Sequence, residues 1–514
     1  MPESDIKYVT LKINGEEARV PPGSTIMQAA DSIGAFIPRY CYHPGLPKVG
    51  NCRICLVEVE GATELLASCV TPVINDMVVH TESEKVKKAR ASVMEFLLIN
   101  HPLDCPFCDK AGECDLQDYA YMYWQPWSRF REKREVQGVK QVSEEIRLYT
   151  DRCILCGRCV RFLDEQADKL TLGFIKRGGH TELEPDPDTV QDSLLAGNIV
   201  DLCPVGALIL EEFLFKSRVW ELEPVKSVCP VCSMGCNIWI DVRENRVLRI
   251  RPRENPQINE HWICDLGRFF FRELSSVARL KQPLVGPKGK LAPAVWEEAI
   301  AFVRDGLNKV RDSSGPEAIA GLGSPYLTRE DNRMLMRLLT EPIGSDRIYL
   351  RDFHKGDRVD FAGGFIISEN RAPNITGAAE ALAMEKWEGS HMGDMLTKID
   401  AGLIKAAVIV AGYPGPQISK QDLEVLAKLE FLAVIDVTGG SWEEVADALL
   451  PGVTSFEKWG TFTAKNGEIQ TIRPALAPPG EARPEWRILA DLARAMGLDI
   501  NITSALDIKI ETGD

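Results

Sequence analysis

The chain has 514 residues and a formal net charge of -15, with 45% hydrophobic and 26% charged residues. This length and composition allow several domains with large buried cores. The acidic balance argues against nucleic-acid binding, and the longest apolar run, residues 406–411, is far too short to span a bilayer. The first residues lack the basic and apolar regions of a signal peptide, so we expect a cytoplasmic protein.

Residues 8–69 have the pattern of a β-grasp ferredoxin. Residues 8–19 alternate as a hairpin with the turn Asn14-Gly15, and Thr25 and Gln28 have capping-box spacing at the start of a helix. We expect the cysteines that follow to bind a 2Fe-2S cluster, although four thiolates also suit zinc and the first interval departs from plant ferredoxins. These cysteines are Cys41, Cys52, Cys55 and Cys69.

A second ligand group follows an amphipathic helix predicted over residues 84–100. It has only three cysteines, Cys105, Cys108 and Cys114, with His101 just before them. Four clusters with four ligands each need sixteen ligands, one more than the fifteen cysteines of the chain. The missing ligand belongs to this group, because three thiolates do not complete a four-iron cluster. We expect His101 to fill that vacancy, and a neutral imidazole should raise the reduction potential, as it does in Rieske centres.

The third group is the most specific signal in the chain. Cys153, Cys156 and Cys159 form a C-x2-C-x2-C run, and Cys203-Pro204 follows at a distance. This is the ligation pattern of a 4Fe-4S cluster, whereas zinc sites usually pair two C-x2-C knuckles. We expect residues 196–210 to provide helical surroundings for the Cys203 turn.

The fourth group lies in a segment with strand character. Strands are predicted over residues 237–242 and 246–251, inside a small β-rich domain. The spacing of this group favours a 4Fe-4S cluster, although zinc also fits it. Its members are Cys229, Cys232, Cys236 and Cys264. Fourteen of the fifteen cysteines thus lie between Cys41 and Cys236, as expected for metal thiolates rather than disulfides.

Beyond residue 274 the composition changes to a cysteine-free α/β pattern, which indicates a doubly wound parallel sheet. Helices are predicted over residues 296–310 and 328–339, and strands over 318–322, 406–411 and 431–436. Glycine-rich turns follow two of these strands, but neither has the G-x-G-x-x-G pattern of a dinucleotide site. We therefore expect no nucleotide there.

The order of the four cysteine groups closely resembles the large iron-sulfur subunit (the 75-kDa or G subunit) of respiratory complex I, the NADH:quinone oxidoreductase. The resemblance implies one 2Fe-2S cluster on the first group and 4Fe-4S clusters on the other three, the second group being completed by His101. The fourth cluster occurs in only some bacterial members, where it looks like a remnant outside the main electron path.

Residues 275–500 resemble a molybdopterin oxidoreductase domain, in the pieces around Trp296-Glu-Glu-Ala and Glu457-Lys-Trp-Gly-Thr-Phe-Thr. The domain is much shorter than in a working molybdenum enzyme, and Leu266 stands where such enzymes carry a lysine two residues after the fourth cysteine. We therefore expect no bound molybdopterin. The expected domains are 1–82 (β-grasp 2Fe-2S), 83–122 (4Fe-4S with one histidine and three cysteines), 123–222 (ferredoxin-like 4Fe-4S), 223–274 (small β-rich 4Fe-4S) and 275–514 (degenerate molybdopterin-oxidoreductase-like α/β).

The resemblance implies an electron-transfer subunit without a catalytic pocket of its own. Electrons would arrive from a flavoprotein subunit that binds FMN and NADH, and would leave toward the hydrophilic subunits of the quinone module. A thioredoxin-like 2Fe-2S subunit is a further expected partner, in the peripheral arm on the cytoplasmic face of a membrane-bound complex. The alternatives are the same module in an NAD-linked hydrogenase or formate dehydrogenase, a catalytic molybdopterin enzyme, and a structural zinc protein.

Overall fold

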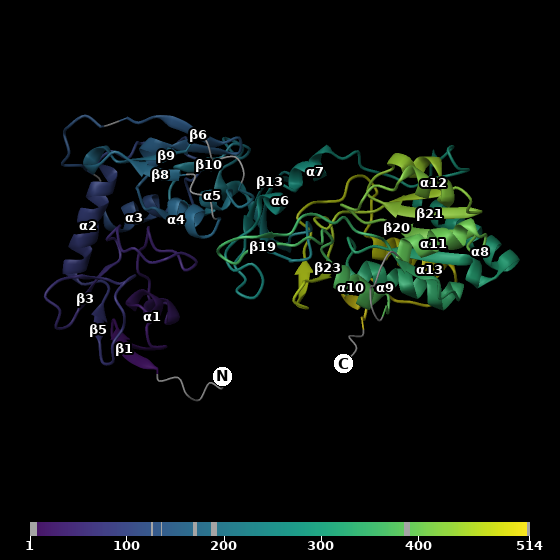
Figure 1. Ribbon diagram of the computed structural model, residues 1–514, viewed down its shortest axis with the longest axis horizontal. Helices are drawn as coiled ribbons and strands as arrows, with labels where there is room; N and C mark the ends of the chain where they lie inside the picture. The colour runs from purple at the N-terminus through teal and green to yellow at the C-terminus, as the bar shows by residue number, and fades with distance from the viewer. Residues whose placement is uncertain are drawn as a thin grey trace. The chain divides into compact units, whose positions relative to one another are not determined.

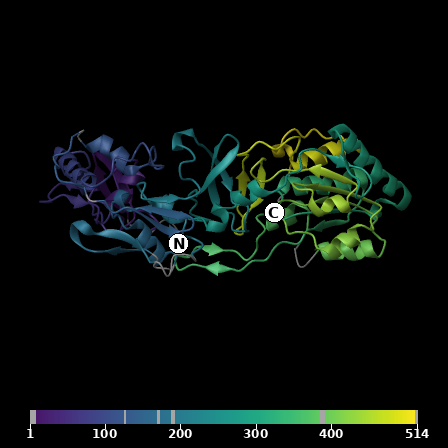
Figure 2. The same cartoon turned by 90° about the horizontal axis from the view of Figure 1, so that it is seen from above.

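The computed structural model describes residues 8–124, 127–134, 136–167, 172–186, 193–384 and 391–510. The first residues, which we expect to lack a targeting signal, lie outside these ranges. The chain divides into two compact units, one up to Leu222 with Phe361–Gly364 added, and one from Glu223 onward. Figures 1 and 2 trace the chain in two views. No helix in the described ranges is long and apolar enough to cross a membrane.

The first unit begins with a mixed sheet and a helix packed on it. The hairpin of β1 and β2 turns at Asn14 and Gly15, both of which have the positive φ of a type I′ turn. Thr25 caps α1 through the expected capping box with Gln28. Within the described residues the strand order is β2-β1-β5-β3-β4, with β1 and β5 parallel. The elements are β1 (Val9–Ile13), β2 (Glu16–Val20), α1 (Ile26–Ser32), β3 (Leu56–Val59), β4 (Leu66–Ala67) and β5 (Val78–His80).

The core of this sheet is apolar and closed to solvent. Leu11, Ile13, Ile26, Val57 and Val79 are at most 1% exposed and belong to one hydrophobic cluster. Each such side chain contributes about 1.5–3 kcal/mol when it is fully buried. This core holds the loops that carry the first cysteine group, which explains why the sequence pattern of strands and helix predicted the fold correctly.

The rest of the first unit surrounds the second and third cysteine groups. The helix predicted over residues 84–100 is present, but it ends at Leu98. The expectation of helical surroundings over 196–210 is only partly right, because Leu208–Leu210 pairs with β7 as strand β10. The elements are α2 (Glu84–Leu98), α3 (Asp115–Tyr123), β6 (Val139–Ser143), β7 (Ile146–Tyr149), α4 (Arg158–Glu165), β8 (Leu172–Ile175), β9 (Glu182–Pro185), α5 (Asn198–Leu202) and β10 (Leu208–Leu210).

The second unit opens with a small antiparallel sheet in the order β11-β12-β13. Both strands predicted for the fourth cysteine group are present, each slightly longer than expected. Two short helices then lead to the α/β part. The elements are β11 (Glu223–Val228), β12 (Asn237–Arg243), β13 (Arg246–Pro252), α6 (Asp265–Arg268) and α7 (Phe271–Ser276).

The α/β part is a doubly wound sheet, as the sequence predicted. Within the described residues its order is β15-β14-β22-β21-β20-β16-β17, with parallel pairing from β22 to β17. The strands are β14 (Leu284–Val285), β15 (Ala292–Pro293), β16 (Ile319–Gly323), β17 (Ile348–Leu350), β20 (Ala406–Val410), β21 (Phe431–Asp436) and β22 (Ala448–Pro451). Two hairpins add β18 (Val359–Asp360) with β19 (Ile366–Ile367), and β23 (Gly460–Thr463) with β24 (Ile469–Ile472).

Helices cover both faces of this sheet, as Figure 1 shows. Val408 and Val410 pack with α8, α9 and α13, whereas Ala407 and Ile409 pack with α11 and α12. Alternate residues of one strand therefore face opposite cores, which is why the strands read as continuous apolar runs. The helices are α8 (Trp296–Ser314), α9 (Arg329–Leu338), α10 (Ile375–Ala381), α11 (His391–Asp400), α12 (Lys420–Leu426) and α13 (Glu485–Ala495).

Candidate iron-sulfur sites

The first cysteine group lies on the loop between α1 and β3, with Cys69 just after β4. Cys41 shares sulfur hydrogen bonds with Cys52 and Cys69, and Cys55 shares one with Cys69. These hydrogen bonds lower the pKa of the Cys41 thiol and lower that of Cys55 to about 6. Arg53, in the turn between Cys52 and Cys55, has a φ of 59°. The structure therefore brings together all four sulfurs that the sequence assigned to one site.

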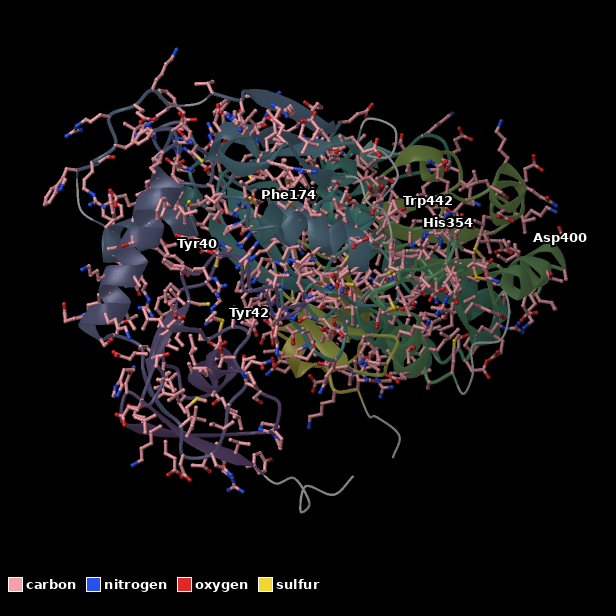
Figure 3. The ribbon with its side chains drawn as sticks, turned by 60° about the vertical axis from the view of Figure 1, so that its left-hand side comes forward. Tyr40, Tyr42, Phe174, His354, Asp400 and Trp442 are labelled. Carbon is pink, nitrogen blue, oxygen red and sulfur yellow. The ribbon has the colours of Figure 1, made fainter. Side chains whose placement is uncertain are left out.

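Tyrosines flank this first group. Tyr40 and Tyr42, labelled in Figure 3, stand on either side of Cys41, and both are buried. The ring of Tyr40 packs against that of Tyr119 in α3, with centroids 5.1 Å apart. Tyr119 follows Cys114 by one helical turn and a residue, so this contact joins the first cysteine group to the second.

The second group spans the loop after α2 and the start of α3. Cys114 is the N-cap of α3, and both Cys108 and Cys114 are buried, whereas Cys105 is exposed. Besides burial, the charge of Cys105 raises the pKa of Cys108, and the charge of Cys108 raises the pKa of Cys114. Burial raises the pKa of Cys114 to about 12. The three thiols thus form one group, and a positively charged metal is what would hold them as thiolates.

His101 lies four residues before Cys105 and lines a pocket that also includes Cys153, and one of its ring nitrogens is in an unusual state. Its Nδ1 is buried and has no hydrogen-bond partner. Burial, assisted by the charge of Arg152, lowers the pKa of His101 to about 4, so the imidazole is neutral at neutral pH. The same arginine influences Cys108. A neutral imidazole with a free, buried nitrogen has the chemistry of a metal ligand.

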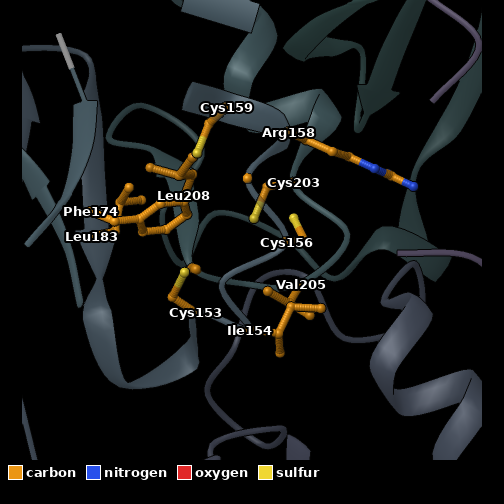
Figure 4. Close-up of a pocket in the computed structure, with 12 residues that line it drawn as sticks. Cys153, Ile154, Cys156, Arg158, Cys159, Phe174, Leu183, Cys203, Val205 and Leu208 are labelled. Carbon is orange, nitrogen blue, oxygen red and sulfur yellow. The ribbon is translucent and has the colours of Figure 1, made fainter. Parts of the chain in front are cut away.

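The third group lines a small, apolar cavity, whose lining residues are drawn in Figure 4. The sulfurs of Cys153, Cys156, Cys159 and Cys203 face a common space, walled by apolar side chains. Burial raises the pKa of Cys153 to about 12 and of Cys156 to about 11. The apolar wall residues include Ile154, Phe174, Leu183, Val205 and Leu208.

The local backbone explains how three thiols of this run reach one space. Leu155 and Gly157 both have positive φ, at 55° and 73°, which turns the chain tightly between Cys153 and Cys159. Cys159 then lies in the first turn of α4, and Cys203 follows α5 directly. Two short helices therefore present the ligand loop and its remote fourth cysteine to the same cavity.

The fourth group belongs to the second unit. Cys229 and Cys236 are joined by a backbone hydrogen bond of 2.8 Å, and Cys264 is the N-cap of α6. All four thiols are buried, and burial raises the pKa of Cys264 to about 12. In addition to burial, the charges of Cys229 and Cys232 raise the pKa of Cys236, and the charge of Cys232 raises the pKa of Cys264. The structure thus brings this group together as well.

The residues of these groups fit iron-sulfur clusters. In the described ranges, no three His, Cys, Asp or Glu side chains converge as ligands of a single metal ion. A cluster is several atoms across, so its ligands need not meet at one point. The apolar cavity of the third group and the unpartnered Nδ1 of His101 are the observations that carry this fit.

Direct contacts join the second group to the third. The backbone N–H of Asp115 donates to the carbonyl of Pro204, at 3.0 Å, so the residues that follow Cys114 and Cys203 are in contact. Gly206 faces the sulfur of Cys108. Arg152 pairs with Asp104 and also donates to the carbonyl of Gly206. Two ligand loops far apart in the sequence therefore share one packed boundary.

Several of these residues were missed by sequence reasoning. Arg152 and Gly206 have no distinctive sequence signal, because an arginine beside a cysteine run and a glycine after a Cys-Pro turn are both ordinary local features. Their partners are 48 and 98 residues away, at Asp104 and Cys108. A single sequence carries no signal for such pairs.

This fold and these cysteine groups are those of an iron-sulfur protein. Family models match in a consistent order along the chain. They are a 2Fe-2S iron-sulfur cluster binding domain (7–84), the NADH-ubiquinone oxidoreductase-G iron-sulfur binding region (90–124), the ferredoxin-like domain of NADH-quinone oxidoreductase subunit 3 (143–209), an NDSU1/NuoG-like 4Fe-4S domain (222–272) and molybdopterin oxidoreductase (374–495).

Similar proteins carry related names. The G subunit of NADH-quinone oxidoreductase from Rickettsia felis is 43% identical over 345 residues, which cover 67% of this chain and 50% of that protein. The 78 kDa subunit of NADH-ubiquinone oxidoreductase from Candida albicans is 31% identical, covering 98% of this chain and 85% of that protein. A solved NAD+-reducing [NiFe]-hydrogenase chain is 32% identical with a TM-score of 0.38, over 41% of this chain and 91% of that chain.

The chain belongs to the family of the large iron-sulfur subunit of NADH-quinone oxidoreductase, also named the G subunit or the 75 kDa subunit. It contains the 2Fe-2S and 4Fe-4S binding domains of that family. The chain spans about half the length of the Rickettsia relatives it matches.

Proposed function

We propose that this chain is an electron relay of NADH:quinone oxidoreductase, which takes electrons from the NADH-oxidising flavoprotein and passes them toward the quinone module. The observation that carries the proposal is the junction of three cysteine groups within the first unit. The first group meets the second through Tyr40 and Tyr119, and the second meets the third through Asp115 and Pro204. Such contacts suit transfer between neighbouring centres.

The proposed ligands are those that the sequence predicted. The first group would hold a 2Fe-2S cluster and the third and fourth groups a 4Fe-4S cluster each. The second would hold a 4Fe-4S cluster with His101 as its one non-thiolate ligand, bound through Nδ1, the nitrogen that is buried and unpartnered. Such clusters take up and release single electrons.

The residues of the chain itself would place and insulate these centres. Apolar side chains such as Phe174, Leu183 and Leu208 exclude water from the third site. A drier surrounding makes each nearby charge and hydrogen bond more effective, so ligand type, burial and charge set each reduction potential. The positive Arg152, close to both His101 and Cys108, should favour the reduced state of the second site.

The partners follow from the relay function. They would be a flavoprotein subunit that binds FMN and NADH, a thioredoxin-like 2Fe-2S subunit and the hydrophilic subunits of the quinone module. The chain would lie in the peripheral arm of the membrane-bound complex, on the cytoplasmic face. Identification of the subunits that co-purify with it tests this: a nickel-iron hydrogenase pair in place of proton-pumping membrane subunits would contradict the proposed complex.

The α/β part would serve as scaffold rather than as a pterin enzyme. Ligands of doubly wound sheets bind beyond the carboxyl ends of the strands, where the strand order reverses, which here lies between β16 and β20. Arg351 is buried at this edge and donates hydrogen bonds to the carbonyls of Ala411 and Pro416. Its guanidinium also occupies the space beside Gly415.

Metal and cofactor analysis of the purified complex tests these assignments. We expect about 14 irons per chain with matching acid-labile sulfide, from one 2Fe-2S and three 4Fe-4S clusters. About ten irons would mean that one 4Fe-4S site, first of all that of Cys229 to Cys264, is empty. Zinc in place of iron would contradict the relay function, and stoichiometric molybdenum and pterin would contradict the scaffold role.

A further inference from the structure

Arg158 occupies a position that no cysteine motif explains. It is the first residue of α4, between Cys156 and Cys159, and it is 8% exposed. In Figure 4 its side chain extends away from the four sulfurs of the third group. An arginine that only shielded the ligand loop would not need to reach out of it.

The guanidinium of Arg158 reaches the ligand loops of two different groups. Its Nη2 donates to the carbonyl oxygen of Tyr42, at 2.7 Å, and its Nη1 donates to that of Leu202, at 3.1 Å. Tyr42 follows Cys41 of the first group directly, and Leu202 directly precedes Cys203 of the third. One planar fork thus ties the backbone beside a ligand of each group.

The neighbouring Arg161 supports this arrangement from the next turn of α4. Its guanidinium donates to the carbonyls of Cys41 and Pro47, both in the first ligand loop. The third carbonyl that it reaches is that of Gly157, within its own helix cap. Arg161 thus ties α4 to the first group, whereas the tie to the remote ligand of the third group belongs to Arg158.

We infer that Arg158 is a positioning residue for electron transfer, which fixes the separation of the first and third sites and raises the reduction potential of the third. The inference rests on the proposed relay function. An arginine stays protonated, and its fork holds two carbonyls at once, which a lysine cannot do in the same geometry. A fixed positive charge favours the site that has gained an electron, and transfer between two centres falls steeply as their separation grows.

The test uses the full chain in its assembled complex, with the variants Arg158→Gln and Arg158→Lys. Midpoint potentials come from EPR-monitored redox titration, and the rate of arrival of electrons at the third site from rapid freezing after NADH is added. Arg158→Gln removes the charge, and we expect the ratio of reduced to oxidised third site to fall about tenfold at a given ambient potential, a shift of about 59 mV to lower potential. Arg158→Lys keeps the charge, so we expect a smaller shift and a several-fold slower arrival of electrons.

A matched control separates this role from general damage to the fold. Arg90 in α2 is completely buried and bonds to Glu82 and Tyr123, neither of which belongs to a cysteine loop. Arg90→Gln should lower the stability of the first unit and leave the potential of the third site equal to that of the parent chain. EPR signals and iron content of all variants show whether the clusters are present.

The outcomes divide clearly. Parent-like potentials and arrival rates in either Arg158 variant that retains its clusters would overturn the inference. Loss of the third cluster in both Arg158 variants, but not in Arg90→Gln, would make Arg158 an assembly residue and would overturn it as well. Absence of iron-sulfur signals from the parent chain would instead contradict the proposed function itself.

Discussion

Substitution of Gly206 by alanine should damage the second cysteine group through packing alone. Gly206 does not have a left-handed φ, so the backbone itself would tolerate alanine. A Cβ at this position, however, would lie under 3.0 Å from Cys108 Sγ, a separation that real Cβ atoms essentially never show, and 3.2 Å from Lys110 Cβ. As a proposed cluster ligand, Cys108 would not be able to swing aside as a free side-chain end would.

The magnitude follows from this geometry. Overpacking a close-packed site costs about 1–3 kcal/mol, and we expect the upper end because the obstructing atom is held in place. For a unit of roughly 150–250 residues each kcal/mol lowers Tm by about 2–4 °C, which gives a loss of about 6–12 °C. Alternatively the site yields instead of the fold, and about four of the irons are lost.

Thermal unfolding and iron analysis of the full chain measure both results. The control is Gly173→Ala in β8, because Gly173 also lacks a left-handed φ and a Cβ there meets nothing within 4 Å. Gly206→Ala with full iron content, parent-like EPR signals and a Tm equal to that of Gly173→Ala would refute the packing argument. It would also show that the boundary between the second and third groups has room for a methyl group that the structure does not show.

Three further predictions concern single side chains. His101→Cys should keep a four-iron cluster and lower its potential, since a thiolate is anionic, and His101→Ala should leave a labile iron; unaltered EPR spectra and potentials in both variants would remove His101 from the ligand set. Lys458→Met leaves Asp331 and Glu485 buried without their counter-charge, which should cost about 3–5 kcal/mol in chemical denaturation, against under about 1 kcal/mol for Lys405→Met at an exposed ion pair. Burial raises the pKa of Glu485 from 4.5 to about 7, so the folded state binds this proton more tightly than the unfolded state does. The free energy of unfolding should therefore fall as pH rises between these two values. If a Glu485→Gln chain kept the same pH slope, Glu485 would be excluded as its source.

Local sequence patterns predicted the secondary structure of both units well. The turn at Asn14-Gly15, the cap at Thr25 and the apolar run Phe431–Asp436 each depend on residues within one element, and each is present as expected. Leu208–Leu210 is the instructive failure. Three apolar residues near a short helix suit either structure, and only the pairing with β7, some sixty residues earlier, makes them a strand.

The ligand groups were visible for a different reason. Ligands on one short loop must be separated by two or three residues, so their spacing can be recognised in the sequence without knowledge of the rest of the fold. The run from Cys153 to Cys159 is an example. The charged supports of the sites leave no such trace. Arg158 meets Tyr42 at a separation of 116 residues, and Lys458 meets Asp331 at 127, so both depend on how whole elements pack.

The division of the chain bears on the role of the fourth group. Its loop is held by contacts from the α/β part: Ser233 bonds Ser368 at 2.9 Å, and the amide of Gln470 donates to the carbonyl of Gly235 at 2.7 Å. The first three groups instead hold one another, through Arg158, Tyr40 and the Asp115 contact with Pro204. A relay needs its centres fixed relative to one another, and that mutual bracing is found in the first unit. We therefore propose that a fourth cluster at Cys229–Cys264 stabilises its own unit and is not one that every electron must pass.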